Sequence, residues 1–194
     1  MFYVIISLLC ICYLSFFEWC LHRFVMHQKF LRFSYAFLAH AGTHHGKFRS
    51  DQTYHLHTHP HDRKTITMAW WNGGVLVAIV TLTSIPACIM LSNWWIALIM
   101  CLCTASYYAA YEYSHWCMHL PKKRKMETFF LFRWLNGHHL LHHRYPKRNF
   151  NVVLPLADLC LRTLLIRSPI SFKQATGPSI PCVQPKKREL IARF

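Results

Sequence analysis

Residues 65–113 read TITMAWWNGGVLVAIVTLTSIPACIMLSNWWIALIMCLCTASYYAAYEY and contain no Lys or Arg. Two apolar halves flank the short SNWW turn. At about 1.5 Å per residue, each half is long enough to cross a bilayer core about 30 Å thick. Tryptophan pairs at 70–71 and 94–95 stand where aromatic belts mark the two interfaces of a membrane. The stretch therefore predicts a transmembrane helical hairpin, with spans at about 66–91 and 94–114.

The distribution of basic residues also indicates a membrane protein. The 194-residue chain has a net charge of +15, yet residues 1–22 and 65–121 contain no Lys or Arg. These two zones are the most apolar, which is the positive-inside pattern of a polytopic membrane protein. A nucleic-acid-binding protein would also be basic, but it would not carry apolar segments of spanning length. We therefore expect no nucleic-acid partner.

The N-terminal stretch FYVIISLLCICYLSFF (2–17) predicts one further span, at about 2–20. It lacks the basic n-region and the small-residue cleavage site of a signal peptide, so we interpret it as an anchor. We expect an all-α integral membrane protein with about three transmembrane helices. The N-terminus would lie outside, and residues 22–64 and 112–194 would lie on the cytosolic side.

The segments outside the spans complete a single domain, 1–194. KFLRFSYAFLAHAG (29–42) is amphipathic and predicts a segment at the membrane surface. Residues 22–64 and 115–166 are expected to form a cytosolic helical cap, followed by a loosely structured tail at 168–194. The nine cysteines form no CxxC pair and several lie in apolar runs, so we expect no disulfide framework.

Ten of the fifteen histidines fall in four motifs: HRFVMH (22–27), HAGTHH (40–45), HWCMH (115–119) and HLLHH (139–143). Neutral imidazole is a common ligand of iron, zinc and copper, and ten imidazoles at about three to six per metal indicate two metals. All four motifs fall on one side of the predicted membrane, so we predict a dimetal site in the cap. Its predicted ligands are His22, His27, His40, His44, His45, His115, His119, His139, His142 and His143.

The spacing within the motifs predicts which histidines converge, because residues three or four apart share one helix face. Three pairs are expected to aim at one point: His40 with His44, His115 with His119, and His139 with His142. The second histidine of each HH pair points about 100° away, toward a second metal or the far wall of the site. His22 and His27 are five apart and diverge by about 140° on an α-helix. They would serve two metals or need a local bulge.

The remaining histidines are left outside the predicted ligand set. In HLHTHPHD (55–62) they alternate along what we interpret as an exposed loop, or a proton or metal relay at the mouth of the site. These are His55, His57, His59 and His61. His138 has no partner at ligand spacing.

Two carboxylates lie close to the motifs in sequence. Glu18 precedes His22 by four residues and Glu112 precedes His115 by three. Each could accept the free ring N–H of a ligand histidine, or each could instead face lipid headgroups or a basic side chain.

The four histidine motifs resemble those of the fatty acid hydroxylase/sterol desaturase superfamily, and are most similar to the fatty acid 2-hydroxylase branch. The continuation HHRYPKRNFNVVLPLADLCLRTL (142–164) also resembles that branch, which has an Asn-aromatic pair before a Pro…Asp segment. The resemblance covers about residues 15–166. The protein departs from the family in its span count, since the family more often has four, and in the three residues that precede His-His in HAGTHH.

The resemblance implies a non-haem diiron centre that activates O2 and inserts one oxygen atom into a C–H bond of a lipid's acyl tail, as in 2-hydroxylation of a fatty acyl or sphingolipid chain. It implies two iron ions as cofactors, although a purified sample could carry zinc. No fused cytochrome precedes the motifs, so electrons would come from a separate cytochrome- or ferredoxin-type protein with its reductase. The host membrane would be the endoplasmic reticulum in a eukaryote or the inner membrane in a bacterium.

Three alternatives stay open. A lipid desaturase, or a sterol or carotenoid hydroxylase, would use the same kind of dimetal centre. A metal transporter or storage protein would instead place ionisable residues within the spans, and between their ends these spans hold none.

The basic runs KKRK (122–125) and KKR (186–188) favour contact with anionic headgroups or with an acidic electron donor.

Overall fold

The computed structural model describes residues 1–32, 34–55 and 60–166, and these residues form helices and loops without a β-strand. The prediction of an all-α protein is therefore confirmed for this part of the chain. The elements are α1 (Phe2–Leu21), η1 (His22–Met26), α2 (Tyr35–Phe37), η2 (Leu38–His44), α3 (His45–Lys47), η3 (Gln52–Tyr54), η4 (Pro60–Thr65), α4 (Trp70–Leu82), α5 (Ile85–Met90), α6 (Trp95–His119), α7 (Lys125–Thr128), α8 (Phe130–Arg144) and α9 (Leu156–Cys160). The tail predicted at 168–194 and residues 56–59 of the histidine-rich loop lie outside the described residues.

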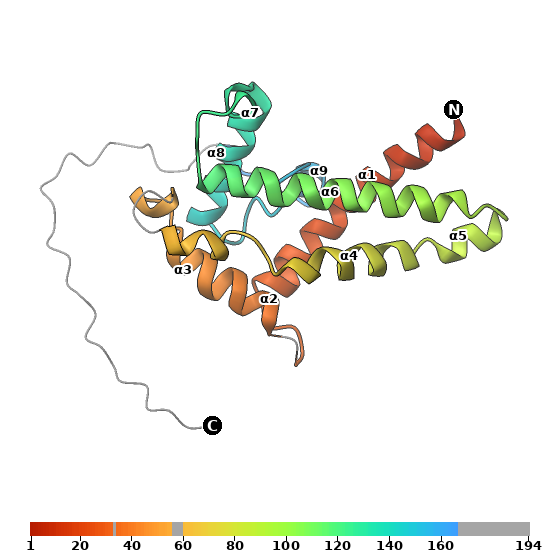
Figure 1. Cartoon of the computed structure of the whole chain (residues 1–194), viewed down its shortest axis with the longest axis horizontal. Helices are drawn as coiled ribbons and strands as arrows, with labels where there is room; N and C mark the ends of the chain where they lie inside the picture. Colours follow the sequence, from red (N-terminus) through yellow and green to blue (C-terminus); the bar gives the residue numbers. More distant parts are fainter. Residues whose placement is uncertain (33, 56–59, 167–194) are drawn as a thin grey trace, which may run out of the picture.

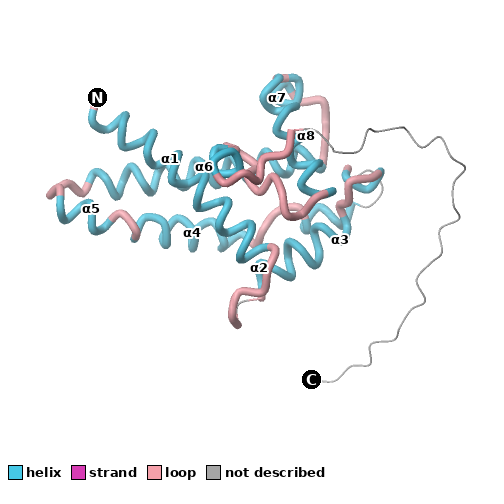
Figure 2. Tube along the Cα trace, turned by 180° about the vertical axis from the view of Figure 1, so that it is seen from behind, coloured by secondary structure: helices cyan, strands magenta, loops and turns pink. Residues whose placement is uncertain are grey.

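The predicted hairpin is formed by α4, α5 and α6, which run side by side and reverse direction at one end of the molecule (Figures 1 and 2). The reversal occupies the SNWW turn, where Ser92 has a positive φ and the Asn93 side chain accepts a hydrogen bond from the Trp95 amide at 3.1 Å. Helix α1 crosses this pair and packs on α6 through a small apolar cluster that includes Leu14 and Val80.

Two helical segments, Phe2–Met26 and Arg63–Met90, are long and apolar enough to cross a membrane. Helix α6 is not among them, because its second half carries tyrosines, Glu112 and two histidines of the cap. The coarse expectation of apolar spanning helices is thus met by two segments. A three-span topology stays a prediction.

The predicted span at 66–91 is not one continuous helix. It breaks at 83–84, between α4 and α5, just before Pro86, whose ring removes a backbone N–H and clashes with the preceding turn. Side-chain hydroxyls hold the break: Thr83 donates to the Val80 carbonyl and Ser84 to the Thr81 carbonyl, each at 2.6 Å. Hydroxyl bonds of this kind make a helix break tolerable in an apolar environment.

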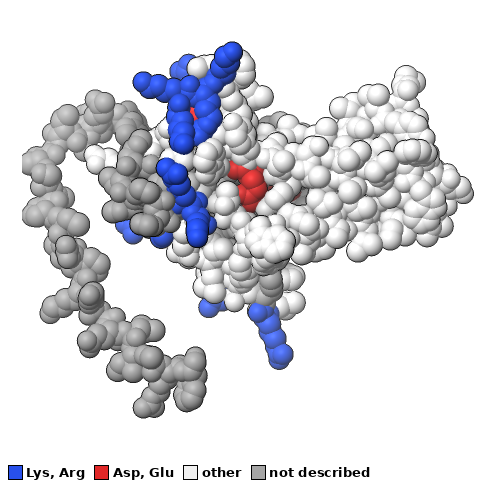
Figure 3. Space-filling model, viewed as in Figure 1, with Lys and Arg blue, Asp and Glu red and all other residues white. Residues whose placement is uncertain are grey.

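Charge divides the molecule into two ends. On the face seen in Figure 3, Lys and Arg gather at the end that carries α7 and α8. The opposite end, where α5 joins α6, carries none, and large apolar side chains stand exposed there, such as Met90 at 84% and Trp94 at 64%. Exposed apolar side chains in this number are typical of a surface that a membrane or a partner protein covers. The ten histidines of the four motifs belong to the charged end.

The packing of α4 on α6 depends on a glycine. A Cβ atom at Gly73 would lie 2.5 Å from Cε1 of the Tyr108 ring, whereas a Cβ atom at the neighbouring Gly74 would meet nothing within 4 Å. We expect Gly73→Ala to force the Tyr108 ring aside and to destabilise the fold by about 1–3 kcal/mol. Thermal unfolding of the detergent-solubilised protein measures the effect, with Gly74→Ala as the matched control. Equal unfolding midpoints for the two variants would contradict this account of the contact.

Candidate metal centre

The ten predicted ligands converge in the structure as two groups of five. Within each group the nearest ring nitrogens, one from each histidine, all lie within 4.8 Å of one another. The first group comprises His22, His27, His40, His45 and His142. The second group comprises His44, His115, His119, His139 and His143. Two groups agree with the expectation of two metals rather than one or four.

The spacing of the ring nitrogens fits a metal ion in each group. Neighbouring Nε2 atoms are 2.8–3.1 Å apart in the first group. They are 3.0–3.3 Å apart in the second group. Two nitrogen ligands at about 2.1 Å from a metal, at right angles to each other, lie about 3.0 Å apart. Five nitrogens at this spacing are close enough together to hold a single metal ion.

The tautomers of the histidines support the same conclusion. In five of the ten, Nδ1 lies within hydrogen-bond distance of a backbone carbonyl oxygen, and a carbonyl can only accept. The pairs are His22 with Phe150, His44 with Thr65, His119 with Tyr54, His142 with Arg148 and His143 with Phe48. Each Nδ1 is therefore the protonated nitrogen, and each Nε2 presents a lone pair to the centre of its group. Lone pairs that face one another at these distances repel unless a cation lies between them, and a ring N–H held by a carbonyl is the usual support of a metal-bound histidine.

A π-helix explains how His22 and His27 reach the same group. Residues His22–Met26 form η1, and the His27 amide donates to the His22 carbonyl at 3.1 Å, which is an i→i+5 bond. Of the two interpretations of the HxxxxH spacing, the local bulge is correct and service to two metals is wrong. Single π-turns of this kind occur often at functional sites.

A second π-helix, η2, corrects the pairing predicted for HAGTHH. His40 joins His45 in the first group, with their Nε2 atoms 3.1 Å apart, while His44 belongs to the second group. The prediction that His40 and His44 converge is wrong. It assumed α-helical geometry, whereas the wider turn of η2 brings residues five apart into register.

The pairing predicted for HLLHH is also wrong. Helix α8 is α-helical through this motif, and His139 pairs with His143 in the second group, with Nε2 atoms 3.0 Å apart. His142 turns to the first group. The prediction that the two histidines of an HH pair point to different places is confirmed in both motifs, and His115 with His119 converge as expected.

Burial keeps the imidazoles neutral. Desolvation lowers the pKa of His27 to about 4, and desolvation together with repulsion from His27 lowers the pKa of His142 to about 3. Desolvation also lowers the pKa of His40 and His139 well below the ordinary value for histidine. At neutral pH the rings are therefore unprotonated, which is the form that binds a metal.

The same shifts predict that the metal-free protein is sensitive to acid. The unfolded chain takes up protons at a pKa of about 6.5, so each buried histidine favours unfolding as the pH falls below that value, at up to about 1.4 kcal/mol per pH unit. For His142, whose folded pKa is about 3, the stability present above pH 6.5 is lost progressively down to about pH 3. We expect the midpoint temperature of thermal unfolding, monitored by tryptophan fluorescence, to decrease as the pH is lowered from 7.5 to 5.5. A His27→Gln, His142→Gln double variant should flatten that dependence, and an unchanged midpoint in the metal-free wild type would contradict the prediction.

The sequence predicts that the two carboxylates accept a ring N–H of a ligand histidine or face lipid headgroups or a basic side chain, but their hydrogen bonds come instead from amide and hydroxyl groups. Glu18 accepts from the Val152 amide at 2.6 Å, the Tyr107 hydroxyl at 2.7 Å and the Asn151 side chain at 3.0 Å. Glu112 accepts from the Tyr108 hydroxyl at 2.7 Å and from the Met68 amide at 3.3 Å. Where a ring N–H of a ligand histidine has an acceptor among the described residues, that acceptor is a backbone carbonyl.

Sequence reasoning missed the loop that supplies two of these carbonyls. The carbonyls of Arg148 and Phe150 hold His142 and His22, two members of the first group that come from α8 and from the end of α1. Asp158 is fully buried and fixes this loop by accepting from the Phe150 and Asn151 amides at 3.0 and 2.8 Å. Backbone acceptors leave no side-chain signal in a sequence. The similarity of residues 142–164 to the hydroxylase branch was the only available pointer.

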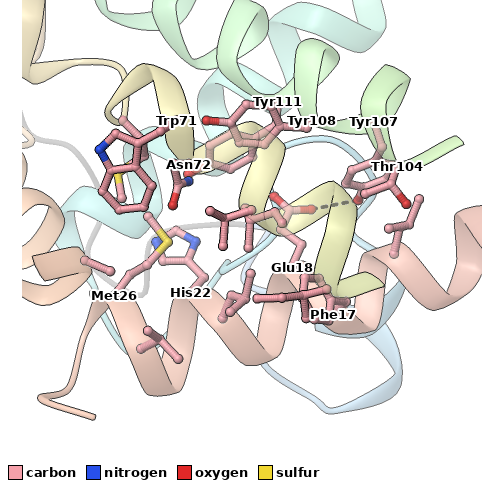
Figure 4. A pocket seen from close by; sticks show the side chains of 18 residues that line it. Phe17, Glu18, His22, Met26, Trp71, Asn72, Thr104, Tyr107, Tyr108 and Tyr111 are labelled. Atoms are coloured by element: carbon pink, nitrogen blue, oxygen red, sulfur yellow. Dashed lines mark hydrogen bonds between the residues drawn. The ribbon is translucent and has the colours of Figure 1, made fainter. Parts of the chain in front are cut away.

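An apolar cavity of about 250 Å³ opens beside the first group, between α1, α4 and α6. Figure 4 shows His22 and Met26 at one end of this cavity and Phe17, Thr104 and Tyr107 toward the other. Its walls are mostly aliphatic and aromatic, and they belong to the helices that carry the exposed apolar surface. The cavity therefore extends from the candidate metal centre, at His22, between the apolar helices α1, α4 and α6.

The protein matches no protein-family model, no curated protein and no solved structure. The relationship to the fatty acid hydroxylase/sterol desaturase superfamily thus stays a prediction from the histidine motifs. The structure itself shows a helical protein with two buried histidine groups, each of which could hold a metal ion.

Proposed function

We propose that this protein is an O2-dependent, non-haem diiron hydroxylase that inserts one oxygen atom into a C–H bond of a lipid's acyl tail, close to a 2-hydroxylase of fatty acyl or sphingolipid chains. One observation carries the proposal. Two five-histidine groups with metal-ligand spacing occur together, and an apolar cavity lies against the first of them, with His22 in its wall. A storage or transport protein has no need of a hydrocarbon-sized cavity at its metal site.

The two groups would hold one iron ion each, and zinc could take their place in a purified sample. All-imidazole ligation suits iron and avoids thiolates that an oxidising centre would attack. When bound, the irons would activate O2 so that one oxygen atom enters the C–H bond and the other leaves as water, with two electrons and two protons drawn from a donor.

The protein's own residues would position the acyl chain and keep water away. Leu21, Val25 and Ile79 in the cavity wall offer no hydrogen bond to water and contact a methylene chain along its length. The carbonyls of Phe150 and Arg148 fix the rings of His22 and His142, so that their Nε2 atoms stay directed at one point. Glu18 holds the same loop through the Val152 amide.

The proposal includes an integral, multi-pass placement in the membrane with the histidine groups on the cytosolic side. Support comes from the two apolar helices, from the exposed apolar end of the hairpin and from the basic residues gathered at the opposite end. The host membrane would be the endoplasmic reticulum or a bacterial inner membrane. A separate acidic cytochrome- or ferredoxin-type protein would deliver electrons at this basic end.

Lipid mass spectrometry on cells grown with ¹⁸O2 tests the proposal. Cells that express the wild type should contain acyl chains with one labelled hydroxyl group, and cells that express His119→Ala should not, because that variant removes a ligand of the second group. His55→Ala is the matched control, since His55 belongs to neither group.

Two other results would change the conclusion. Loss of two hydrogens from a lipid without label would replace the hydroxylase with a desaturase. Identical lipids in wild type and variant, with a full complement of bound metal in the wild type, would overturn the proposal in favour of a metal-handling protein.

A further inference from the structure

A second cavity, of about 300 Å³, reaches the histidine groups from another side. It lies between η2 and the segment 64–69 that leads into α4. His40 of the first group and His44 of the second both line it. This cavity therefore borders both groups, whereas His22 is the only member of either group among the residues described as lining the apolar cavity.

The two cavities share a wall. Met68 lines both, and Ala36 of the apolar cavity follows Tyr35 of the second cavity directly in the sequence. The backbone of this wall is held in place: the Met68 amide donates to Glu112 at 3.3 Å and the Ala69 amide donates to the Tyr35 hydroxyl at 2.9 Å. The Met68 side chain is unbranched and flexible, so it can yield to an acyl tail that passes from one cavity to the other.

The linings of the two cavities differ in chemistry. The apolar cavity is walled by aliphatic and aromatic side chains, while the second carries the hydroxyl of Thr67 and the ammonium group of Lys64. Thr43 also lines the second cavity, but its hydroxyl donates to the Leu38 carbonyl at 2.9 Å. Among the lining residues whose side chains the structure describes, Lys64 is the one with a fixed charge, and none of them is a carboxylate. A hydroxyl donor and an ammonium donor together favour a ligand with anionic oxygen atoms.

We propose that the second cavity binds the head of the lipid substrate, that this head carries anionic oxygens, and that the acyl tail passes Met68 into the apolar cavity. This inference rests on the proposed hydroxylase function and deepens it. His22 lines the apolar cavity and His40 lines the second cavity, and their Nε2 atoms are 2.8 Å apart. The carbon nearest the metal centre is then one close to the head of the lipid, and oxidation near the head follows from the geometry.

Binding of a fluorescent long-chain carboxylic acid and of its methyl ester to the purified, metal-loaded protein tests the head site without turnover. The two probes share a tail and differ only in the charge of the head. We expect the acid to bind about three- to tenfold more tightly, which is modest because Lys64 is exposed. Lys64→Ala should remove this preference and leave ester binding unchanged. Lys125→Ala is the matched control, because Lys125 is equally exposed and lines neither cavity.

Two further arms sharpen the test. Met68→Trp should block the junction and abolish the preference for the acid, whereas Met90→Trp, at an exposed position on the apolar end, should keep it. An alkyl phosphate of the same length distinguishes a phosphate head from a carboxylate. The site is supported if either anionic probe binds more tightly than the methyl ester. Equal binding of acid and ester to the wild type would overturn the inference.

The outcome separates this inference from the proposed function. A labelled hydroxyl group in the middle of the acyl chain would overturn the head site and leave the hydroxylase intact. The opposite outcome can also be recognised. If the purified protein prefers the acid through Lys64 but cells that express it make no labelled lipid, the head site is supported and the hydroxylase is overturned.

Discussion

Replacing His44 and His143 together should leave the protein with about one bound metal ion, whereas replacing His44 and His45 together should leave it with almost none. The first pair belongs to one group, so the other group keeps its five imidazoles. The second pair, although adjacent in the sequence, takes one imidazole from each group. Loss of a ligand that is held by the fold weakens a site strongly, because the remaining ligands cannot close around the ion.

Metal content per protein molecule, measured by mass spectrometry after removal of loosely bound ions, gives the readout directly. His55→Ala, outside both groups, should retain two ions. The single variants His44→Ala and His45→Ala should each lose one ion and resemble each other, so only the double variants reveal the grouping. Equal metal contents in the two double variants would mean that the histidines do not divide as the structure places them.

Asp158→Asn should cause the largest loss of stability among single substitutions of the cap. The carboxylate is fully buried and accepts four hydrogen bonds, from the Phe150 and Asn151 amides, the Thr163 hydroxyl and the His138 ring. Burial alone would raise the pKa of Asp158, but bonds from His138, Thr163 and the two amides lower it below its ordinary value. The amide of the substituted side chain would direct its NH2 group at one or more of these donors, so those donors would lose their acceptor. Loss of a buried hydrogen-bonded carboxylate of this kind costs about 3–5 kcal/mol of folding stability.

Chemical or thermal unfolding of Asp158→Asn measures that loss, with Asp51→Asn as the matched control. Asp51 likewise accepts hydrogen bonds, two of them from Thr53, but its side chain is exposed. Its replacement should therefore change the free energy of unfolding little. The metal sites should respond unequally. The loop that Asp158 fixes holds His22 and His142, so chelator competition should find the first group weakened by about 10–100-fold and the second group unchanged. Equal weakening of both groups would mean that the substitution acts through general unfolding.

The sequence by itself determined the class of the fold and which histidines gather in the candidate metal centre. Apolar stretches without charge, the SNWW turn and the tryptophan pairs were sufficient to predict a helical hairpin, because these features act locally along the sequence. The ten histidines were predictable because they cluster in four short motifs, three of which contain the i+3 or i+4 spacing that places two side chains on one helix face. The division of each HH pair between two places followed from the same geometry.

The tertiary structure alone decided how the histidines are shared. Whether His40 joins His44 or His45 depends on a π-turn, and a π-turn differs from an α-turn by one inserted residue whose cost is offset by packing elsewhere. His139 could reach either His142 or His143 from the same helix, and the choice depends on where the other elements place their rings. The acceptors that fix the rings are backbone carbonyls from segments distant in sequence, such as Phe48, Tyr54 and Phe150. A carbonyl is present at every residue, so only the folded arrangement of these segments selects the ones that hold a ligand.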